Sequence, residues 1–312
     1  MKYNKINNIE LPVSEIGFGA WAIGSQDYGK VEEADAFRSL KTFVKGGGNF
    51  IDTARVYNRS EERIGKFLKQ EKIRDEIVIA TKTVELKEIK IRNDIETSLK
   101  NLNTDRIDLY YLHWPPEEED EIDRVLTVFQ NLKKEGKIRA IGASIKGPDV
   151  NQKTVYLCRK YIKDNRIDAL EVVYSILRQK NSEIFKEAQD AGIAIVARTI
   201  LESGFLTGKY KPGHEFSDHR KRWSEERLYA ILEEVENIEE ITIKQPLTNI
   251  TEVALRFVLD NPYITSIIPG AKNAEQVKKN MMGGSLPLLD DDIRNELIER
   301  YYDSSDRFNT DK

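Results

Sequence analysis

Four polar residues stand at or just beyond the ends of short apolar runs, and their chemistry suits proton transfer. Asp52 ends the run NFID, Tyr57 follows in the next loop, Lys82 ends IVIATK, and His113 ends IDLYYLH. A free phenol has a pKa of roughly 10 and is a poor acid at neutral pH. A lysine ammonium within about 4–6 Å lowers the pKa of a phenol, and a carboxylate can hold that lysine in place. We therefore predict that Tyr57 is a tuned general acid and that His113 steers a carbonyl oxygen.

Each of these residues also has an ordinary structural explanation. A single Asp–Lys pair often serves only the fold, a tyrosine in a loop usually packs, and a histidine that closes an apolar strand is usually a hydrogen-bonded core residue. The catalytic interpretation gains its support from position, because Asp52, Lys82 and His113 close three successive runs.

The elements that position these residues follow a repeating pattern of apolar runs and amphipathic stretches. The runs begin near Glu15, Asn49, Ile77, Ile107, Ala140, Ala169, Ile193 and Thr265. Continuous runs of this kind are typical of strands that are covered on both faces. Eight strands alternating with helices predict an α/β fold, a (β/α)8 TIM barrel, in which catalytic groups lie at the C-terminal ends of the strands. A doubly wound sheet is the second possibility, but no GxGxxG follows the first run.

Other segments are expected to complete this fold as a single domain over residues 1–312. Residues 2–14 (KYNKINNIELPVS) predict a hairpin that turns at Asn7-Asn8 and closes the bottom of the barrel. Glycine and proline in residues 204–222 predict a mobile loop. Two added helices are expected over 223–240 and 289–302, and a frayed tail over 303–312.

Composition excludes several classes of protein. The 312 residues carry 49 Lys+Arg and 53 Asp+Glu, a net charge of −4 without a basic cluster, so nucleic acid is not an expected partner. The one cysteine, Cys158, cannot form an intrachain disulfide, which favours a reducing compartment. Neither a membrane span nor a signal peptide is visible in the sequence. We expect a cytoplasmic protein, with a monomer as the default because oligomeric state cannot be read from the sequence.

The chain resembles the aldo-keto reductase family over essentially its whole length. GGGNFIDTARVY and SEERIGKFL resemble the family's Asp-and-Tyr motif and the segment after it. IATK resembles the lysine strand, and TDRIDLYYLHWP resembles the histidine motif. SGFLTGKY resembles the loop that closes over the cofactor, and IPGAKNAEQVKKN resembles the nucleotide-binding segment. The six motifs occur in the family's order.

The resemblance implies a carbonyl reductase that uses NADPH without a metal. Asp52, Tyr57, Lys82 and His113 would form its catalytic tetrad, with Tyr57 protonating the oxygen. The cofactor residues that it implies are Ser144, Glu171, Arg198, Phe205, Leu206, Gly208, Lys209, Gly270, Lys272, Gln276 and Asn280. Lys272 near a helix start would suit a 2′-phosphate, which favours NADPH over NADH, although a solvated helix face is the alternative.

Three of the implied nicotinamide contacts depart from the family's pattern. Ile145 replaces an asparagine, Glu171 replaces a glutamine, and Arg198 replaces a stacking tyrosine, as it does in some bacterial and archaeal branches. A guanidinium can stack like a ring, but it also introduces a cation beside the nicotinamide. Our hypothesis is that Glu171 neutralises Arg198 beneath the cofactor; the alternative is independent drift with weaker nicotinamide positioning.

Aromatic residues near the implied site suggest a substrate pocket. Trp21, Tyr28 and Trp114 would line it, which suits hydrophobic or sugar substrates without choosing between them. His214 and His219 lack a third ligand at motif spacing, so we expect no metal.

Three functions stay open at this point. The first is reduction of an aldehyde or ketone by NADPH. The second is oxidation of an alcohol or sugar by the same residues. The third, from a different class, is a cofactor-sensing regulatory subunit with little turnover.

Overall fold

The computed structural model describes residues 1–24, 27, 29–145, 147, 150–243, 247 and 249–308. Its strands are β1 (Tyr3–Asn4), β2 (Val13–Ser14), β3 (Phe18–Gly19), β4 (Phe50–Asp52), β5 (Val78–Thr83), β6 (Ile107–Leu112), β7 (Ile138–Ser144), β8 (Ala169–Val173), β9 (Ala194–Arg198) and β10 (Ile264–Ile267). Its α-helices are α1 (Trp21–Gly24), α2 (Glu33–Lys45), α3 (Ser60–Glu71), α4 (Glu88–Leu102), α5 (Glu119–Lys134), α6 (Gln152–Asp164), α7 (Phe185–Asp190), α8 (Glu225–Thr242), α9 (Ile250–Leu259), α10 (Ala274–Met282) and α11 (Asp291–Tyr301). Short 3-10 helices are η1 (Arg74–Glu76), η2 (Lys180–Ile184), η3 (Glu202–Thr207), η4 (His219–Arg222), η5 (Gly283–Ser285) and η6 (Tyr302–Phe308).

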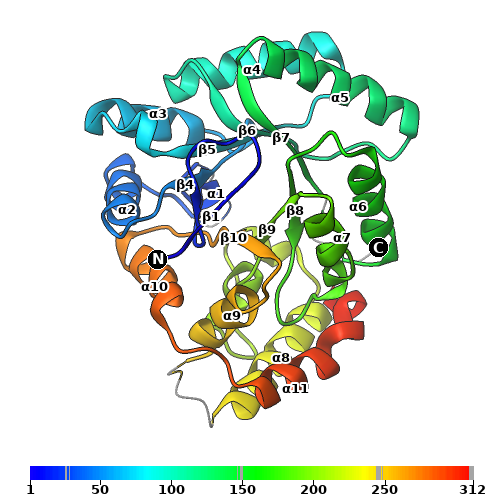
Figure 1. The fold of residues 1–312 in the computed structure, drawn as a ribbon. Helices are drawn as coiled ribbons and strands as arrows, with labels where there is room; N and C mark the ends of the chain where they lie inside the picture. Colours follow the sequence, from blue (N-terminus) through cyan, green and yellow to red (C-terminus); the bar gives the residue numbers. More distant parts are fainter. Residues whose placement is uncertain are drawn as a thin grey trace.

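The eight strands from β3 to β10 form one parallel sheet in chain order, which confirms the predicted TIM barrel. The sheet closes where β10 meets the chain around β3. There the Gly17 amide donates to the Ile267 carbonyl (2.7 Å) and the Ile267 amide donates to the Glu15 carbonyl (2.9 Å). Figure 1 shows the strands at the centre with the helices around them.

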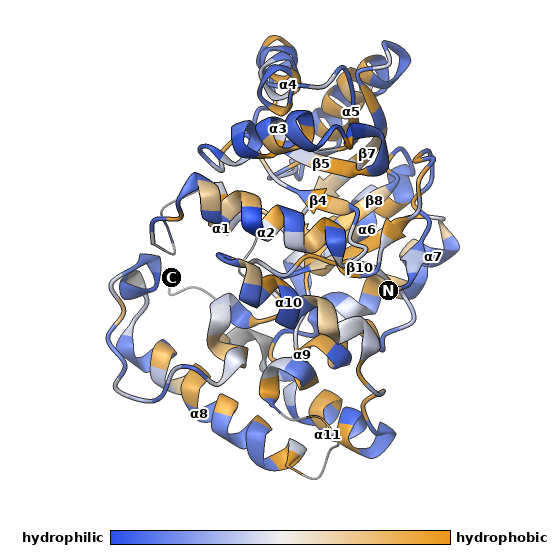
Figure 2. Ribbon diagram, turned by 90° about the vertical axis from the view of Figure 1, so that its left-hand side faces the viewer, coloured by the Kyte–Doolittle hydropathy of each residue, from blue (hydrophilic) through white to orange (hydrophobic). Residues whose placement is uncertain are grey.

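The strands are hydrophobic and the helices are amphipathic, as Figure 2 shows by colour. Every residue of β5 and β6 is buried, because helices cover the outside of the barrel and side chains fill its interior. Local signals set the helix ends. Asn151 and Thr154 form a reciprocal capping box at the start of α6, and Asn165, in a left-handed conformation (φ 59°), ends that helix.

The predicted N-terminal hairpin is present as β1 paired antiparallel with β2. Its apolar residues Ile6, Ile9 and Val13 belong to one buried cluster with interior residues of the barrel such as Phe50 and Val78. The hairpin therefore closes the end of the barrel at which the strands begin.

The expected C-terminal additions are also present, with one correction. The predicted helices over 223–240 and 289–302 are α8 and α11. The predicted frayed tail is wrong as far as residue 308, because Phe308 is buried and its carbonyl accepts from Arg227 Nη2 (2.9 Å). Of the helices in the described ranges, none combines the length and the apolar character that a membrane crossing requires.

Candidate active site

The alternation of strand residues brings the predicted polar groups to the end of the barrel where the strands finish, which we call the rim. Side chains two positions apart in a strand share a face. Residues two positions before the polar groups are therefore barrel-interior residues: Phe50 before Asp52, Ala80 before Lys82, Tyr111 before His113, Ala169 before Glu171 and Val196 before Arg198. Apolar packing below thus supports a polar rim above.

Lys82 is the centre of the rim and is fully buried. Its ammonium forms an ion pair with Asp52, donates to the Thr53 carbonyl (3.0 Å) and lies 3.2 Å from Glu171 Oε2. Burial alone would lower the pKa of Lys82, but Asp52 and Glu171 outweigh it and raise the pKa. Lys82 is therefore positively charged.

The two carboxyl groups beside Lys82 differ in proton affinity. Burial and the neighbouring Glu171 raise the pKa of Asp52 well above its usual value. Burial also pushes the pKa of Glu171 upward, yet Lys82 and Arg198 together hold it below its usual value. The difference has a simple cause, because Glu171 faces two cations and Asp52 faces one.

Tyr57 comes to the rim on the loop between β4 and α3. Its backbone passes close to Gly24, where a Cβ atom would lie 2.1 Å from the Tyr57 carbonyl oxygen. The tyrosine ring is half-buried, with Lys82 Nζ 5.6 Å from its centroid, Trp21 stacked at 6.1 Å and His113 edge-on at 5.7 Å. The structure therefore brings Asp52, Tyr57, Lys82 and His113 together.

The pKa of Tyr57 moves in the opposite direction from the sequence prediction. Burial raises the pKa of the phenol to about 12, because the lowering by Lys82 is opposed by Asp52 and Glu171 as well. The prediction left out burial, which is the largest cause, while the second carboxylate, Glu171, is opposed by a second cation, Arg198. Tyr57 is consequently a protonated phenol at neutral pH.

His113 follows β6 and faces Tyr57. Its amide donates to the Thr83 carbonyl (2.8 Å), which fixes the backbone beside β5. Burial and the nearby Lys82 lower the pKa of the imidazole to about 3. Among the described residues, no group hydrogen-bonds to the buried His113 Nδ1. The imidazole is therefore neutral, so that one ring N–H is present as a hydrogen-bond donor.

The residues expected around the nicotinamide adjoin this group. Ser144 Oγ donates to Glu171 Oε1 (2.8 Å), and Arg198 Nε lies 3.4 Å from the same oxygen. The predicted Glu171–Arg198 contact is therefore present. Arg198 Nη2 also donates to the carbonyl of Ile145 (2.8 Å), the residue that replaces an asparagine.

The segment that resembles the cofactor loop is packed into the protein through its aromatic residues. The side chains of Phe205 and Leu206 are fully buried, and Phe205 stacks on Trp223 at 5.5 Å. These two side chains serve packing, so any contact with a cofactor would come from their backbone. Gly208 has a left-handed conformation (φ 67°), and Lys209 after it is exposed. The predicted mobility of residues 204–222 stays a prediction.

Basic groups converge near the start of α10. The pKa of Lys272 is lowered by its partial burial and then by the charges of Lys209 and Arg220. Asp218, which forms an ion pair with Arg220, opposes this shift, so the excess positive charge beside α10 comes from Lys209 and Lys272 and suits the phosphates of a nicotinamide dinucleotide. Sequence reasoning missed Arg220, since nothing in its local pattern separates it from other loop arginines.

Side chains in the same segment brace the loop before α10. The Lys272 amide donates to Gln276 Oε1 (2.8 Å), and Asn280 Nδ2 donates to the carbonyl of Gly270 (3.2 Å). Asn273 caps α10 by accepting from the Gln276 amide (3.0 Å). The predicted phosphate and adenine contacts of Gln276 and Asn280 stay predictions.

Aromatic side chains border the catalytic group. Trp21 stacks on Tyr57, and Trp114, which is 49% exposed, lies beside His113 with the ring centroids 5.6 Å apart. The third predicted pocket residue, Tyr28, lies outside the described residues. Asp27 links this region to the loop before α8, because it accepts from Trp21 Nε1 (2.7 Å) and its carbonyl lies 2.9 Å from His219 Nδ1.

Histidine and cysteine serve packing elsewhere. His214 packs between the rings of Tyr210 and Phe216. Across the part of the chain that the structure describes, no cluster of His, Cys, Asp and Glu is arranged to hold a metal ion. Burial raises the pKa of the free Cys158 thiol to about 12, which makes it a poor nucleophile.

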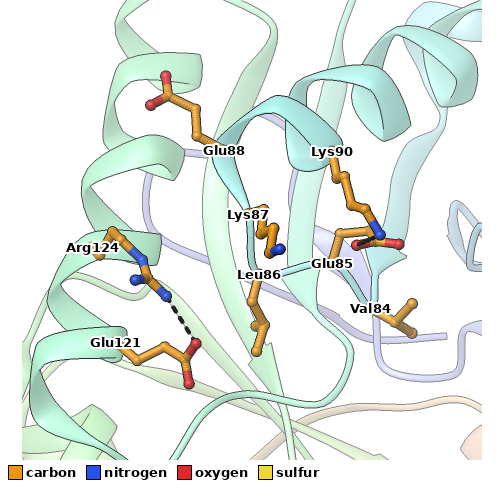
Figure 3. Close-up of a pocket in the computed structure, with 8 residues that line it drawn as sticks. All are labelled: Val84, Glu85, Leu86, Lys87, Glu88, Lys90, Glu121 and Arg124. Atoms are coloured by element: carbon orange, nitrogen blue, oxygen red, sulfur yellow. Dashed lines mark hydrogen bonds and ion pairs between the residues drawn. The ribbon is translucent and has the colours of Figure 1, made fainter.

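An open hollow of about 550 Å³ lies between the segment after β5 and the start of α5 (Figure 3). Charged residues of this hollow pair with one another, Arg124 with Glu121 (2.9 Å) and Lys90 with Glu85 (3.2 Å). None of the residues that line it belongs to the catalytic group, so we assign the chemistry to the rim.

The sequence analysis also missed one residue, Tyr111, and one contact of the rim. Tyr111 lies beneath Lys82, whose Nζ is 5.4 Å from its ring centroid, and a Cβ atom at Gly142 would lie 2.3 Å from that ring. Tyr111 could have been predicted, because it precedes His113 by two positions at the end of β6 and therefore faces the same side of the strand. The other omission was the contact between Glu171 and Lys82.

Comparison with known proteins agrees with this site. The model of the Aldo/keto reductase family matches residues 15–297. Aldo-keto reductase YhdN of Bacillus subtilis is 28% identical, with 96% of this chain and 94% of that protein covered. The NADH-specific methylglyoxal reductase of Escherichia coli is 30% identical, with 94% and 96% covered.

A solved structure extends the agreement to the fold. An aldo-keto reductase from Bacillus halodurans in its holo form superposes with a TM-score of 0.78 at 27% identity, with 96% of each chain covered. The match of a family model to most of the chain, together with the barrel and its rim, establishes the relationship. This chain belongs to the aldo/keto reductase family, whose members are oxidoreductases that act on aldehydes and ketones with nicotinamide cofactors.

Proposed function

We propose that this protein reduces an aldehyde or ketone to an alcohol, with hydride from NADPH and a proton from Tyr57. The observation that carries the proposal is the setting of Tyr57. Its ring lies 5.6 Å from the buried ammonium of Lys82 and edge-on to a neutral His113. The phenol stays protonated at neutral pH, as a proton donor must.

Each side chain would have a separate task. A carbonyl oxygen placed between Tyr57 and His113 would accept hydrogen bonds from the phenol and from an imidazole N–H. As negative charge develops on that oxygen, the proton of Tyr57 moves to it, and Lys82 stabilises the phenolate that remains. Asp52 and Glu171 keep Lys82 charged and in place. The bound nicotinamide supplies the hydride.

The protonation state of Tyr57 at neutral pH is the one that reduction needs. Reduction needs a protonated Tyr57, whereas oxidation needs the phenolate as a base. Because the pKa of Tyr57 is about 12, the donor form predominates at neutral pH.

Lys272 supports NADPH over NADH. It lies at the start of α10, close enough to Lys209 and Arg220 for their charges to lower its pKa. Asp218 already pairs with Arg220, so a 2′-phosphate would act on Lys272 and Lys209, and NADH lacks that phosphate. The Escherichia coli relative is named as NADH-specific, so both cofactors belong in the test.

The remaining surroundings suggest the kind of substrate. Trp21 and the exposed Trp114 flank Tyr57 and His113, which favours carbonyl compounds with an apolar or aromatic group. The free, buried Cys158 supports a reducing compartment such as the cytoplasm.

The test is consumption of NADPH with a panel of aldehydes by the wild-type protein and by Tyr57→Phe. We expect Tyr57→Phe to lose activity by about a hundred- to ten-thousand-fold while it still binds NADPH. Tyr156→Phe, which alters an exposed tyrosine on α6, is the matched control and should keep full activity. The same assay with NADH, repeated on Lys272→Gln, tests cofactor preference, which that substitution should weaken.

Two results would contradict the proposal. Full activity of Tyr57→Phe would exclude Tyr57 as the acid. Tight cofactor binding without turnover in either direction would favour a regulatory role.

A further inference from the structure

Glu171 contacts two cations that come from different parts of the barrel. Its side chain on β8 is 1% exposed. One carboxylate oxygen lies 3.2 Å from Lys82 Nζ on β5, and the other lies 3.4 Å from Arg198 Nε on β9 and accepts from Ser144 Oγ (2.8 Å). The carboxylate therefore bridges Lys82, on which Tyr57 depends, and Arg198.

Backbone groups contact Arg198 on one side, and its side chain is 23% exposed. Its Nη2 donates to the Ile145 carbonyl (2.8 Å), and a Cβ atom at Gly147 would lie 2.7 Å from the same nitrogen. The glycine leaves room for the guanidinium. These contacts keep the guanidinium beside Glu171.

The four charged groups form a series of alternating sign: Asp52, Lys82, Glu171, Arg198. Glu171 and Arg198 carry opposite charges that cancel. Loss of one partner from a buried ion pair leaves a charge that the interior solvates poorly. Removing Glu171 alone would leave an excess positive charge, and removing Arg198 alone would leave an excess negative charge.

This balance bears on the cofactor, and the argument here rests on the proposed function. The carbon that receives hydride is bonded to the oxygen that Tyr57 protonates, so the hydride donor must bind at the same rim. An oxidised nicotinamide ring carries a positive charge that the reduced ring lacks. An excess charge at Glu171 or Arg198 would therefore favour one redox form of the cofactor over the other.

We propose that Glu171 and Arg198 are a charge-balanced extension of the tetrad that sets the relative affinity for oxidised and reduced cofactor. Glu171 lowers the electrostatic penalty that Arg198 imposes on the oxidised form. Through Lys82, the same carboxylate acts as a positioning residue for the proton donor. The pair is thus a determinant of redox-state preference, a role distinct from the positioning of Tyr57.

The test is the ratio of the Kd values for NADP⁺ and NADPH, measured by fluorescence titration. Relative to wild type, Glu171→Gln should raise this ratio about ten-fold and Arg198→Gln should lower it about ten-fold, as expected for unit charges roughly 10 Å apart at an effective dielectric constant of about 20. The double variant should return within about three-fold of wild type. The ratio is used because a general loss of structure weakens the binding of both cofactor forms, so that its effect cancels in the ratio.

Glu234→Gln is the matched control. It also removes a buried carboxylate that contacts an arginine, Arg307 (3.0 Å), but Glu234 lies on α8 and has no contact with the tetrad. Its ratio should equal that of wild type. The unfolding midpoint of each variant shows whether it folds. If Glu171→Gln does not fold, Glu171→Asp takes its place; because this substitution keeps the charge, the ratio of Kd values must stay that of wild type.

The outcomes separate this inference from the proposed function. If wild type binds both forms and the ratio is unchanged in the single variants, or moves in the same direction in both, the charge-balance inference is overturned and the proposed function stands. If wild type binds neither NADPH nor NADH, nor their oxidised forms, both fail.

Discussion

The pKa values of Tyr57 and His113 are shifted from their ordinary values in opposite directions. Burial raises the pKa of Tyr57 to about 12, and burial with Lys82 lowers the pKa of His113 to about 3. Tyr57 therefore loses its proton only near pH 12, and His113 gains one only near pH 3. Between about pH 5 and 9 neither residue changes its charge.

The rate of carbonyl reduction should consequently show no pH limb from either residue in that range. We expect profiles of kcat/KM for wild type and His113→Asn to have the same shape, with the variant slower at every pH. Any pH dependence of kcat/KM within that range would come from the Asp52–Glu171 carboxyl pair and would persist in His113→Asn. A wild-type limb near pH 6.5 that His113→Asn abolishes would contradict the neutral imidazole.

At the scale of residues, the sequence predicts which residues form the site better than it predicts which of them touch. Asp52, Lys82 and His113 could be predicted because each ends an apolar run, and strand ends share a rim. The contact between Lys82 and Glu171 could not, because β6 and β7 separate their strands and the two side chains meet across the barrel interior. The direction of the Tyr57 pKa shift failed because burial of the phenol, which the sequence of a loop does not reveal, is the largest cause of the shift.

At the scale of elements, Glu61 joins the loop that carries Tyr57 to its neighbours. This buried carboxylate at the start of α3 accepts hydrogen bonds from Thr81 on β5 (2.8 Å) and Ser98 on α4 (2.7 Å). It also accepts from Arg55 (2.9 Å), two positions before Tyr57. One side chain therefore fixes a strand, two helices and the catalytic loop relative to one another.

Glu61→Gln should damage both stability and catalysis. The amide keeps the shape, but it loses the charge that Arg55 requires and turns an NH2 group toward other donors, so we expect a loss of about 2–4 kcal/mol in the free energy of unfolding. A looser Tyr57 loop should lower kcat about ten-fold at saturating NADPH. Urea unfolding and steady-state kinetics measure the two effects.

Glu62→Gln is the control for Glu61→Gln, since Glu62 is the next residue but is exposed and contacts Arg59 only at 3.8 Å. It should change neither quantity measurably. If the two variants behave alike, Glu61 does not organise the loop.

Element prediction succeeded where hydrophobic periodicity was strong and failed where burial came from distant contacts. Eight strands and both added helices were expected from their runs. The polar sequence 303–312 predicted a frayed end, yet Phe308 is buried and Arg227 of α8 donates to its carbonyl. Such docking depends on the surface that α8 presents, which the local sequence does not contain.

At the scale of the whole molecule, the two ends of the barrel do different work. The rim concentrates buried charges, which are poor contributors to stability. The opposite end is closed by the hairpin, whose Ile6, Ile9 and Val13 pack against interior residues. The residues that stabilise the barrel and those that carry the chemistry therefore lie at opposite ends of its axis, which is the usual arrangement in TIM barrels.

Ile6→Ala tests this separation. Ile6 is fully buried in the bottom cluster, and truncation of such a side chain should reduce the free energy of unfolding by about 2–5 kcal/mol. Because the cavity would lie at the end remote from Lys82 and Tyr57, the kcat and KM of the folded protein at 25 °C should match those of wild type. Leu11→Ala, on the same hairpin but 37% exposed, should change stability by less than about 0.5 kcal/mol. A fall in kcat with Ile6→Ala would instead mean that the hairpin positions the rim through the strands.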